Sequence, residues 1–325
     1  MFNNNYYFSD YKLNIQTNSG YINDSIRYYF SVYDNIEYFR DYCHTVDLII
    51  DSTDNFKLAD LFEYIHKNSK KKYSVNKRFD IHQIDCDNFL ISFYNKICIA
   101  ELNIRTKKIK CFFEKPERFG IDFIPNFIVI ALIEILFKFE NRFFIHSAAL
   151  EKQGNTVIIS GASGSGKSTL AFFLMNAGYK LLTDDKTYAL IENNSIVIRG
   201  LLQPVDIIKG KDDFLINADI VKNIAQSLDD ENKRIVISAF KPEKIGIKGR
   251  PHIILFPKVG ESFDANKISA KNALVKLMRS SVTPNFNINL QTHFEILNKI
   301  VDNSKTYDIL MDKDFSKILK FIDNL

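Results

Sequence analysis

The chain has 325 residues, of which 46% are hydrophobic and 25% are charged, so it is long enough to bury a large core and to form two domains. Its 43 basic and 39 acidic residues leave a formal net charge of +4. No long basic tract is present, which argues against a nucleic-acid-binding protein. These properties predict an ordinary globular protein.

The cysteines and the amino terminus predict a protein of the reducing cytoplasm. The four cysteines form no C-x-x-C pair, and three of them lie in apolar or aromatic stretches where a reduced thiol packs as a small hydrophobe. They are Cys43, Cys86, Cys98 and Cys111. The first residues contain neither the basic segment nor the apolar core of a secretory signal, so the mature chain is expected to start near Met1.

Residues 1–120 are predicted to form a smaller α+β domain that recognises a substrate or partner. Aromatic and β-branched runs predict strands, and apolar spacing predicts one helix at residues 58–65. The predicted strands cover residues 26–33, 46–50, 88–94 and 97–104, with a hairpin turn at residues 95–96. The basic stretch at residues 67–78 is interpreted as a solvated helix-to-strand loop, with a docking surface as the alternative.

Residues 121–325 are predicted to form the second domain, which opens with the most apolar run of the chain at residues 121–139. Glu134 and Lys138 interrupt this run, and a charge near the centre of a bilayer would be costly. Pro125 is compatible with a first helical turn, where a missing N–H matters little. The run therefore predicts a buried helix that connects the two domains, not a membrane span.

The central motif is a glycine-rich loop that matches the pattern G-x-x-x-x-G-K-[ST] at every fixed position. Its residues are Gly161, Ala162, Ser163, Gly164, Ser165, Gly166, Lys167, Ser168 and Thr169. A short apolar run precedes the loop and a helical pattern follows it, which is the strand-turn-helix context that the motif requires. We expect the backbone N–H groups to cradle ATP phosphates, Lys167 to reach the β- and γ-phosphates, and the Ser168 hydroxyl to ligate Mg²⁺.

Two adjacent carboxylates, Asp184 and Asp185, end the next short strand, shortly after the loop helix and its predicted C-cap at Gly178. Phosphoryl transfer needs one acid on the metal and another facing the acceptor hydroxyl. Adjacent residues at a strand end point to opposite sides, which suits this division of labour. The pair is interpreted as functional in preference to a solvated turn.

The rest of the second domain reads as further strands and helices. Strands are predicted at residues 143–150, 195–198 and 252–257, a hairpin turn at 154–155, and helices at 270–279, 294–297 and 315–322. His146 lies on the first of these strands, and taken alone it would more often be a hydrogen-bonded core histidine than a catalytic one. The polar stretch at residues 209–241 is either a mobile segment over the acceptor site or a plain surface helix and loop.

Residues 141–190 resemble the catalytic block of HPr kinase/phosphorylase and its relatives. His146, Gly178, Asp184 and Asp185 stand at that family's offsets from Lys167. The resemblance implies an α/β fold, namely a P-loop kinase domain of the HPr kinase/phosphoenolpyruvate-carboxykinase-like type with a mixed sheet and flanking helices. It further implies ATP and Mg²⁺ as cofactors, transfer of the γ-phosphoryl group to a serine hydroxyl, Asp185 as the general base, and Asp184 with Ser168 at the metal.

The sequence departs from this family at two places. If Arg199-Gly200 is the family's arginine-glycine pair, Val197 occupies the position of its metal-site glutamate. The later tyrosine-aspartate-arginine segment has no clear counterpart, which leaves Arg250, Arg279 and Lys209 as candidates for stabilising charge on the transferred phosphoryl. The reverse dephosphorylation reaction is therefore not inferred.

The favoured function is a kinase that acts on a peptide or small protein, with a precursor peptide among the candidates. A small-molecule kinase is the first alternative, although the stretch at residues 201–240 lacks the arginine-rich lid usual in those enzymes. A non-catalytic ATP-binding module is the second, although Lys167, Ser168, Asp184 and Asp185 form a full set of charges and ligands. No nucleic-acid or membrane partner is expected, and formation of a homo-oligomer stays open.

Overall fold

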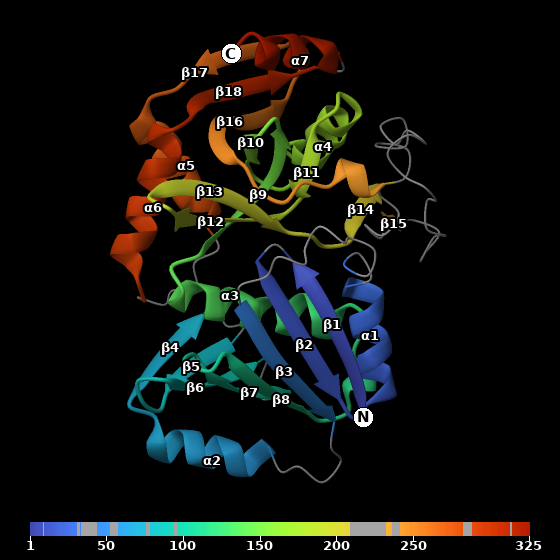
Figure 1. The fold of residues 1–325 in the computed structure, drawn as a ribbon, viewed down its shortest axis with the longest axis vertical. Helices are drawn as coiled ribbons and strands as arrows, with labels where there is room; N and C mark the ends of the chain where they lie inside the picture. Colours follow the sequence, from blue (N-terminus) through green and yellow to red (C-terminus); the bar gives the residue numbers. More distant parts are fainter. Residues whose placement is uncertain are drawn as a thin grey trace. The chain divides into compact units, whose positions relative to one another are not determined.

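The computed structural model describes residues 1–8, 10–30, 33, 44–52, 58–75, 79–93, 97–208, 232–235, 241–281, 288–312 and 314–325. The chain divides into two compact units (Figure 1). The first contains Met1–Glu140 with Thr283–Asn289, and the second contains Asn141–Val282 with Leu290–Leu325. Each unit holds an eight-stranded mixed sheet with flanking helices, so the protein belongs to the mixed α/β class.

The sheet of the first unit has the strand order β1-β2-β3-β8-β7-β6-β5-β4. Strand β2 alternates buried and half-buried residues along its whole length, the pattern of a strand with one face on the core. The strands are β1 (Phe2–Phe8), β2 (Tyr11–Thr17), β3 (His44–Ser52), β4 (Lys71–Val75), β5 (Phe79–Gln83), β6 (Asn88–Phe93), β7 (Cys98–Asn103) and β8 (Lys108–Phe113). The strands predicted at residues 46–50, 88–94 and 97–104 are confirmed over β3, β6 and β7.

The strand predicted at residues 26–33 is wrong, because α1 (Gly20–Phe30) occupies most of it. Ile22, Ile26, Tyr29 and Phe30 are buried at helical spacing. The aromatic run favours a strand by local propensity, but its spacing from the upstream Ile22 matches one face of a helix. Burial of that face decides the outcome.

The helix predicted at residues 58–65 is confirmed as α2 (Leu58–Asn68). The basic stretch at residues 67–78 includes the end of this helix and the edge strand β4, so it is more ordered than the predicted loop over those residues. The predicted turn at residues 95–96 lies outside the described residues, although β6 and β7 pair antiparallel on either side of it.

The apolar run at residues 121–139 is helical, as predicted. It starts as a π-helix at Ile124–Val129 and continues as α3 (Ile130–Phe139), with Pro125 in the first turn. The contacts of the chain place this helix in the first unit. A 3₁₀ turn, η4 (Pro116–Arg118), precedes it. None of the described helices is both long and apolar enough to cross a bilayer.

The sheet of the second unit has the order β13-β12-β9-β10-β16-β18-β17, and β11 also pairs with β9. Its strands are β9 (Phe143–Lys152), β10 (Asn155–Ser160), β11 (Lys180–Thr183), β12 (Lys186–Glu192), β13 (Ser195–Leu201), β16 (Arg250–Val259), β17 (Asp264–Lys267) and β18 (Lys305–Met311). All strands predicted in this region are present. The turn between β9 and β10 is the predicted hairpin, with Gly154 at φ +82°.

Helices cover the second sheet at two places that Figure 1 shows apart. The helices are α4 (Lys167–Asn176), α5 (Ala270–Ser280), α6 (Leu290–Asp302) and α7 (Phe315–Asp323). Helices α5 and α6 share one apolar core with β9, β10 and β16. Helix α4 contacts β9, β10 and β11, and its Phe173 ring lies 5.2 Å from Phe315 of α7. The predicted carboxyl-terminal helices are thus confirmed.

The polar stretch at residues 209–241 lies mostly outside the described residues, and so does the prediction of a mobile segment there. The part that is described forms β15 (Asn232–Ile235), which pairs with β14 (Val205–Ile208) as a two-stranded ribbon. A short 3₁₀ turn, η8 (Pro242–Lys244), follows before β16.

Candidate functional site

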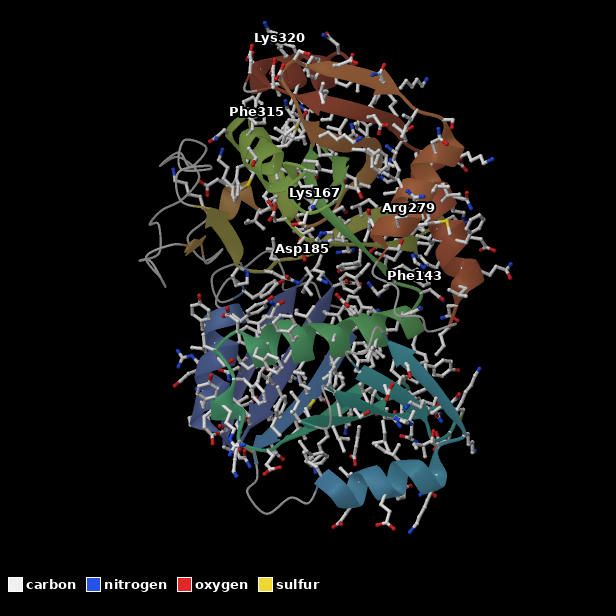
Figure 2. All side chains as sticks on the ribbon, turned by 180° about the vertical axis from the view of Figure 1, so that it is seen from behind. Phe143, Lys167, Asp185, Arg279, Phe315 and Lys320 are labelled. Atoms are coloured by element: carbon white, nitrogen blue, oxygen red, sulfur yellow. The ribbon has the colours of Figure 1, made fainter. Side chains whose placement is uncertain are left out.

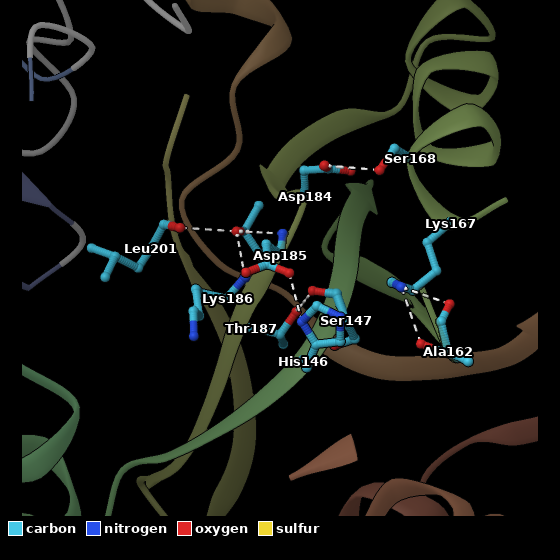
Figure 3. A network of polar contacts seen from close by, with 12 residues as sticks. His146, Ser147, Ala162, Lys167, Ser168, Asp184, Asp185, Lys186, Thr187 and Leu201 are labelled. Atoms are coloured by element: carbon cyan, nitrogen blue, oxygen red, sulfur yellow. Dashed lines mark hydrogen bonds and ion pairs between the residues drawn. The ribbon is translucent and has the colours of Figure 1, made fainter. Parts of the chain in front are cut away.

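Strand β9 gathers the candidate site, because its two neighbours carry the other two parts of it. On one side Ser147 pairs with Ser160, the last residue of β10 before the glycine-rich loop. On the other side His146 pairs with Lys186, the first residue of β12 after the two acids. The loop, the acid pair and His146 therefore meet where β10 ends and β12 begins, beside the middle of β9 (Figure 3).

The glycine-rich loop joins β10 to α4 without a capping side chain at the helix start. The residue before the helix is Gly166, which has φ +91°, a conformation that L side chains rarely adopt. An added Cβ at Gly166 would also overlap Met311 Cε. The loop thus turns sharply into an uncapped helix N-terminus, where backbone N–H groups and the helix dipole favour an anion.

Lys167 opens α4 and bends back over the start of the loop. Its Nζ donates to the carbonyl oxygens of Gly161 at 3.0 Å and Ala162 at 3.2 Å (Figure 3). Only 9% of the residue is exposed. Burial lowers its pKa, while the nearby carboxylates of Asp185 and Asp184 act in the opposite direction. The ammonium therefore lies at the Gly161–Ala162 end of the loop.

Asp184 faces the first turn of α4. Ser168 Oγ donates to Asp184 Oδ2 at 3.0 Å, while Asp184 Oδ1 is buried and has no hydrogen-bond partner among the described residues. Burial raises the pKa of Asp184 to about 6, although the Ser168 hydrogen bond and Lys167 oppose the shift. An unpartnered buried carboxylate oxygen beside a hydroxyl is a donor set that suits a hard cation.

The residues of this corner fit Mg²⁺ held jointly with phosphates. Across the described part of the chain, no group of three or more His, Cys, Asp and Glu side chains forms a metal cage. Mg²⁺ commonly binds through one or two protein oxygens while substrate phosphates and water supply the rest. Ser168 and Asp184 are the two protein ligands that the geometry offers.

Asp185 turns the other way and pairs with His146. His146 Nδ1 donates to Asp185 Oδ1 at 2.6 Å, and both side chains keep solvent access, with 41% and 37% of their surfaces exposed. Burial tends to raise the pKa of Asp185, but the hydrogen bond and charge of His146, with Lys186 and Lys167, hold it below its usual value. Adjacent residues thus carry carboxylates with opposite pKa shifts.

Two threonines that sequence reasoning missed hold the acid turn in place. Thr183 Oγ1 donates to the carbonyl oxygen of Leu201 at 2.9 Å and accepts from the N–H groups of Asp185 and Lys186 at 3.3 and 3.1 Å. Thr187 Oγ1 donates to the Ser147 carbonyl oxygen at 2.8 Å. The two bonds that the threonines donate join partners 18 and 40 residues apart, so no local sequence signal marks those two contacts.

The position that would hold an additional acid in the resembled family is occupied by a core residue. Val197 is 8% exposed, and Arg199, which is 6% exposed, pairs with Glu192 on the neighbouring strand through an N–O distance of 2.5 Å. Lys248 Nζ lies 3.0 Å from Oε2 of the same Glu192 carboxylate and forms a second ion pair with it. Arg199 therefore serves as a structural partner of Glu192.

The three cations proposed for the transferred phosphoryl lie in different places. Arg250 opens β16 opposite Asn155, the residue of β10 farthest from the glycine-rich loop. Lys209 lies outside the described residues. Arg279, which is labelled in Figure 2, lines a cavity beside the loop. His146 lines the same cavity. Arg279 is thus the only one of the two described candidates that the fold brings to the site.

No family model matches the chain, and no curated protein matches it. Among solved structures, the chain is similar to the Hpr(Ser) kinase/phosphatase from Coxiella burnetii, with 13% sequence identity and a TM-score of 0.28 over 56% of this chain and 94% of that chain. A likeness at this TM-score carries no argument, so the function rests on the geometry of the site.

Proposed function

We propose that the protein is an ATP- and Mg²⁺-dependent kinase that transfers the γ-phosphoryl group to a serine hydroxyl of a peptide or small protein. One observation carries the proposal. The fold brings the glycine-rich loop with Lys167, a Ser168–Asp184 oxygen pair and a His146–Asp185 pair together where β10 ends and β12 begins, beside the middle of β9. Phosphoryl transfer needs these three elements: a phosphate cradle, a metal site and a proton acceptor.

The loop and Lys167 would bind the triphosphate. The uncapped start of α4 offers N–H groups and a positive dipole end, and Lys167 brings a positive charge to the start of the loop. Lys167 is held by backbone carbonyls that are weaker partners than a phosphate oxygen, so it can turn to the β- and γ-phosphates when ATP binds.

Ser168 and Asp184 would hold the metal ion. Bound there, Mg²⁺ supplies positive charge to the β- and γ-phosphate oxygens. The buried, unpartnered Asp184 Oδ1 supports this role, because such an oxygen is costly unless a donor or a cation reaches it.

Asp185 would serve as the general base. Its lowered pKa keeps it deprotonated at neutral pH, so it is available to accept the proton of the acceptor hydroxyl. The hydroxyl oxygen then bonds to the γ-phosphorus as the bond between that phosphorus and the bridging oxygen of ADP breaks. His146 holds the carboxylate in position through its Nδ1.

The test is a transfer assay with γ-labelled ATP, Mg²⁺ and a set of serine-containing peptides and small proteins. Wild-type protein should label a serine acceptor, and Lys167→Ala should not. Lys180→Ala is the matched control, since Lys180 is an exposed residue at the opposite end of the strands, paired with Glu151. Bound ATP with no labelled acceptor would favour a non-catalytic module, and label on free metabolites alone would favour a small-molecule kinase.

A further inference from the structure

A cavity of about 520 Å³ opens beside the glycine-rich loop in the second unit. Its walls come from the last residues of β16, the last turn of α5, the start of the loop and His146. The volume falls within the range of roughly 300–1,000 Å³ that is typical of small-ligand sites. The cavity is therefore large enough for a short peptide segment or an amino acid.

The cavity adjoins the end of the loop where the reaction would occur. Gly161 and Ala162 line it, and these are the residues whose carbonyl oxygens hold Lys167 Nζ. His146, the partner of Asp185, lines it as well. A hydroxyl that reaches the γ-phosphate and the base at once would enter from this cavity.

Among the residues that the structure describes, the lining carries positive charge and no carboxylate. Its cations are Lys258, Lys276 and Arg279. Lys276 is neutralised by Asp308, whose Oδ1 lies 2.5 Å from its Nζ. Lys258 and Arg279 are exposed and form no ion pair with the described residues. Two positive charges are thus available to a ligand.

A buried hydroxyl adds a second sign of a polar ligand. Ser160, the last residue of β10, is fully buried and lines the cavity. Its Oγ has no hydrogen-bond partner among the described residues. Buried polar groups are normally paired, so a donor or acceptor on a bound molecule would satisfy it.

We propose that this cavity is the acceptor site and that Arg279, assisted by Lys258, binds a carboxylate of the acceptor. The planar guanidinium matches a carboxylate with two parallel hydrogen bonds, while Lys258 adds a point charge. The acceptor class is a hydroxyl compound that carries a carboxylate, either a serine beside an acidic residue in a peptide or a free hydroxy amino acid. The inference rests on the proposed kinase function.

Direct binding tests the inference without relying on turnover. The probes are acetyl-Asp-Ser-Asp-amide against acetyl-Asn-Ser-Asn-amide, and free L-serine against L-serinamide, titrated calorimetrically onto the full chain with Mg²⁺ and a non-hydrolysable ATP analogue. Wild-type protein should bind one of the carboxylate probes about tenfold more tightly than its amide partner. The pair that shows the preference identifies the source of the carboxylate.

Arg279→Gln should weaken that preference, and the double variant Arg279→Gln with Lys258→Gln should abolish it. The matched control is Lys271→Gln, because Lys271 is an exposed cation in the first turn of the same helix and does not line the cavity. It should keep the preference. Equal binding of acid and amide probes by wild-type protein, or a preference that survives in the double variant, overturns the inference.

Kinetics separate an acceptor-binding role of Arg279 from one on the transferred phosphoryl. If Arg279 binds the acceptor carboxylate, Arg279→Gln raises the acceptor KM about tenfold and leaves the KM for ATP unchanged. A fall in kcat that is equal for acid and amide acceptors would contradict the inference while leaving the kinase function intact. Absence of transfer to any acceptor, with the carboxylate preference still measured in binding, would contradict the kinase function alone.

Discussion

The two units each contain a cavity beside their sheet. The carboxylates that line the first cavity are hydrogen-bonded differently from Asp184, which lies beside the glycine-rich loop of the second unit and does not line the cavity there. The cavity of the first unit, about 660 Å³, is lined by α2 and the neighbouring strands. There Asp47 accepts from Asn14 Nδ2 at 2.7 Å, and Asp85 accepts from the backbone and side chain of Asn88. In the second unit Asp184 keeps a buried oxygen without a partner.

This difference shows that the larger cavity need not mark the candidate functional site. In the first unit the Asn88 hydrogen bonds lower the pKa of Asp85, as expected of a carboxylate that stabilises its turn. In the second unit burial raises the pKa of Asp184. A group held in a state that opposes stability is expected where function requires it.

Of the substitutions considered, Lys167→Ala should lower the activity of the second unit's site the most. Phosphoryl transfer should fall to background, because the main side-chain charge on the β- and γ-phosphates is removed. The fold should persist, as judged by circular dichroism and thermal unfolding. Lys108→Ala is the counterpart in the cavity of the first unit. It should leave phosphoryl transfer unchanged, and equal losses of transfer in the two variants would contradict the assignment of the site.

Asp185→Asn should lower transfer by about 10²–10⁴-fold, the usual contribution of a positioned base. Asn can still accept from His146 Nδ1, so the geometry is retained while the proton acceptor is lost. ATP affinity, measured calorimetrically, should stay near that of the wild type. Near-normal turnover by this variant would show that another group accepts the proton.

Asp184→Asn should lower activity by about 10–100-fold at limiting Mg²⁺ and regain part of it as Mg²⁺ is raised. The reason is that Asn offers a neutral oxygen in place of a charged ligand beside Ser168. Turnover measured against Mg²⁺ concentration checks this. Rescue by metal of Asp185→Asn instead would mean that the roles of the two acids are exchanged.

His146→Ala should lower turnover by about tenfold and shift the acid limb of the kcat profile to higher pH. The His146 hydrogen bond holds the pKa of Asp185 down, so its removal lets that pKa rise and the base becomes protonated at a higher pH. A pH series of kcat at saturating substrates measures the shift. An unchanged acid limb would show that His146 does not control the pKa of the catalytic base.

In the absence of metal and nucleotide, replacing Asp184 and replacing Asp47 should change the free energy of unfolding in opposite directions. The pKa of Asp184 is raised to about 6 from 3.8. Between these values the unfolded chain loses its proton first, so folding stability falls as the pH rises through the window and stays lower above it. Asp184→Asn should therefore raise the free energy of unfolding at pH 7–8 by on the order of 1 kcal/mol, with no gain near pH 4.

Its counterpart in the first unit is Asp47→Ala, which should lower the free energy of unfolding by about 1 kcal/mol through loss of the Asn14 hydrogen bond. Phosphoryl transfer should not change. Thermal unfolding of both variants at several pH values checks the pair. A loss of stability in Asp184→Asn at pH 7–8 would remove the contrast between Asp184 and the carboxylates of the first unit.

The main chemical groups of the site could be predicted from the sequence because they lie in local patterns. The loop from Gly161 to Thr169 needs only a strand before it and a helix after it, and the acid pair ends the next strand. The threonines that hold the acid turn could not be predicted. Thr183 and Thr187 donate hydrogen bonds to the carbonyl oxygens of Leu201 and Ser147, and only strand pairing brings these partners near. The position of the carboxyl-terminal end of α5 beside the cavity could not be predicted either, because it also depends on how distant parts of the chain pack.

The fold of the first unit was harder to predict where local propensity and periodicity disagree. Residues 26–33 carry aromatic and β-branched side chains that favour a strand. The burial of Ile22, Ile26 and Tyr29 on one helical face shows that α1 is selected by packing against the unit's core. By contrast, the residues of 46–50 alternate in burial as a strand requires, and the strand predicted there is confirmed.

The most direct test of the account is mass spectrometry of an acceptor after incubation with ATP and Mg²⁺. Wild-type protein should add the mass of one phosphoryl group to a serine-containing acceptor, and fragmentation should place it on the serine. Asp185→Asn should add it at least a hundredfold more slowly while binding ATP normally. An acceptor modified equally fast by both proteins, or ATP bound by wild-type protein with no acceptor modified, would contradict the account.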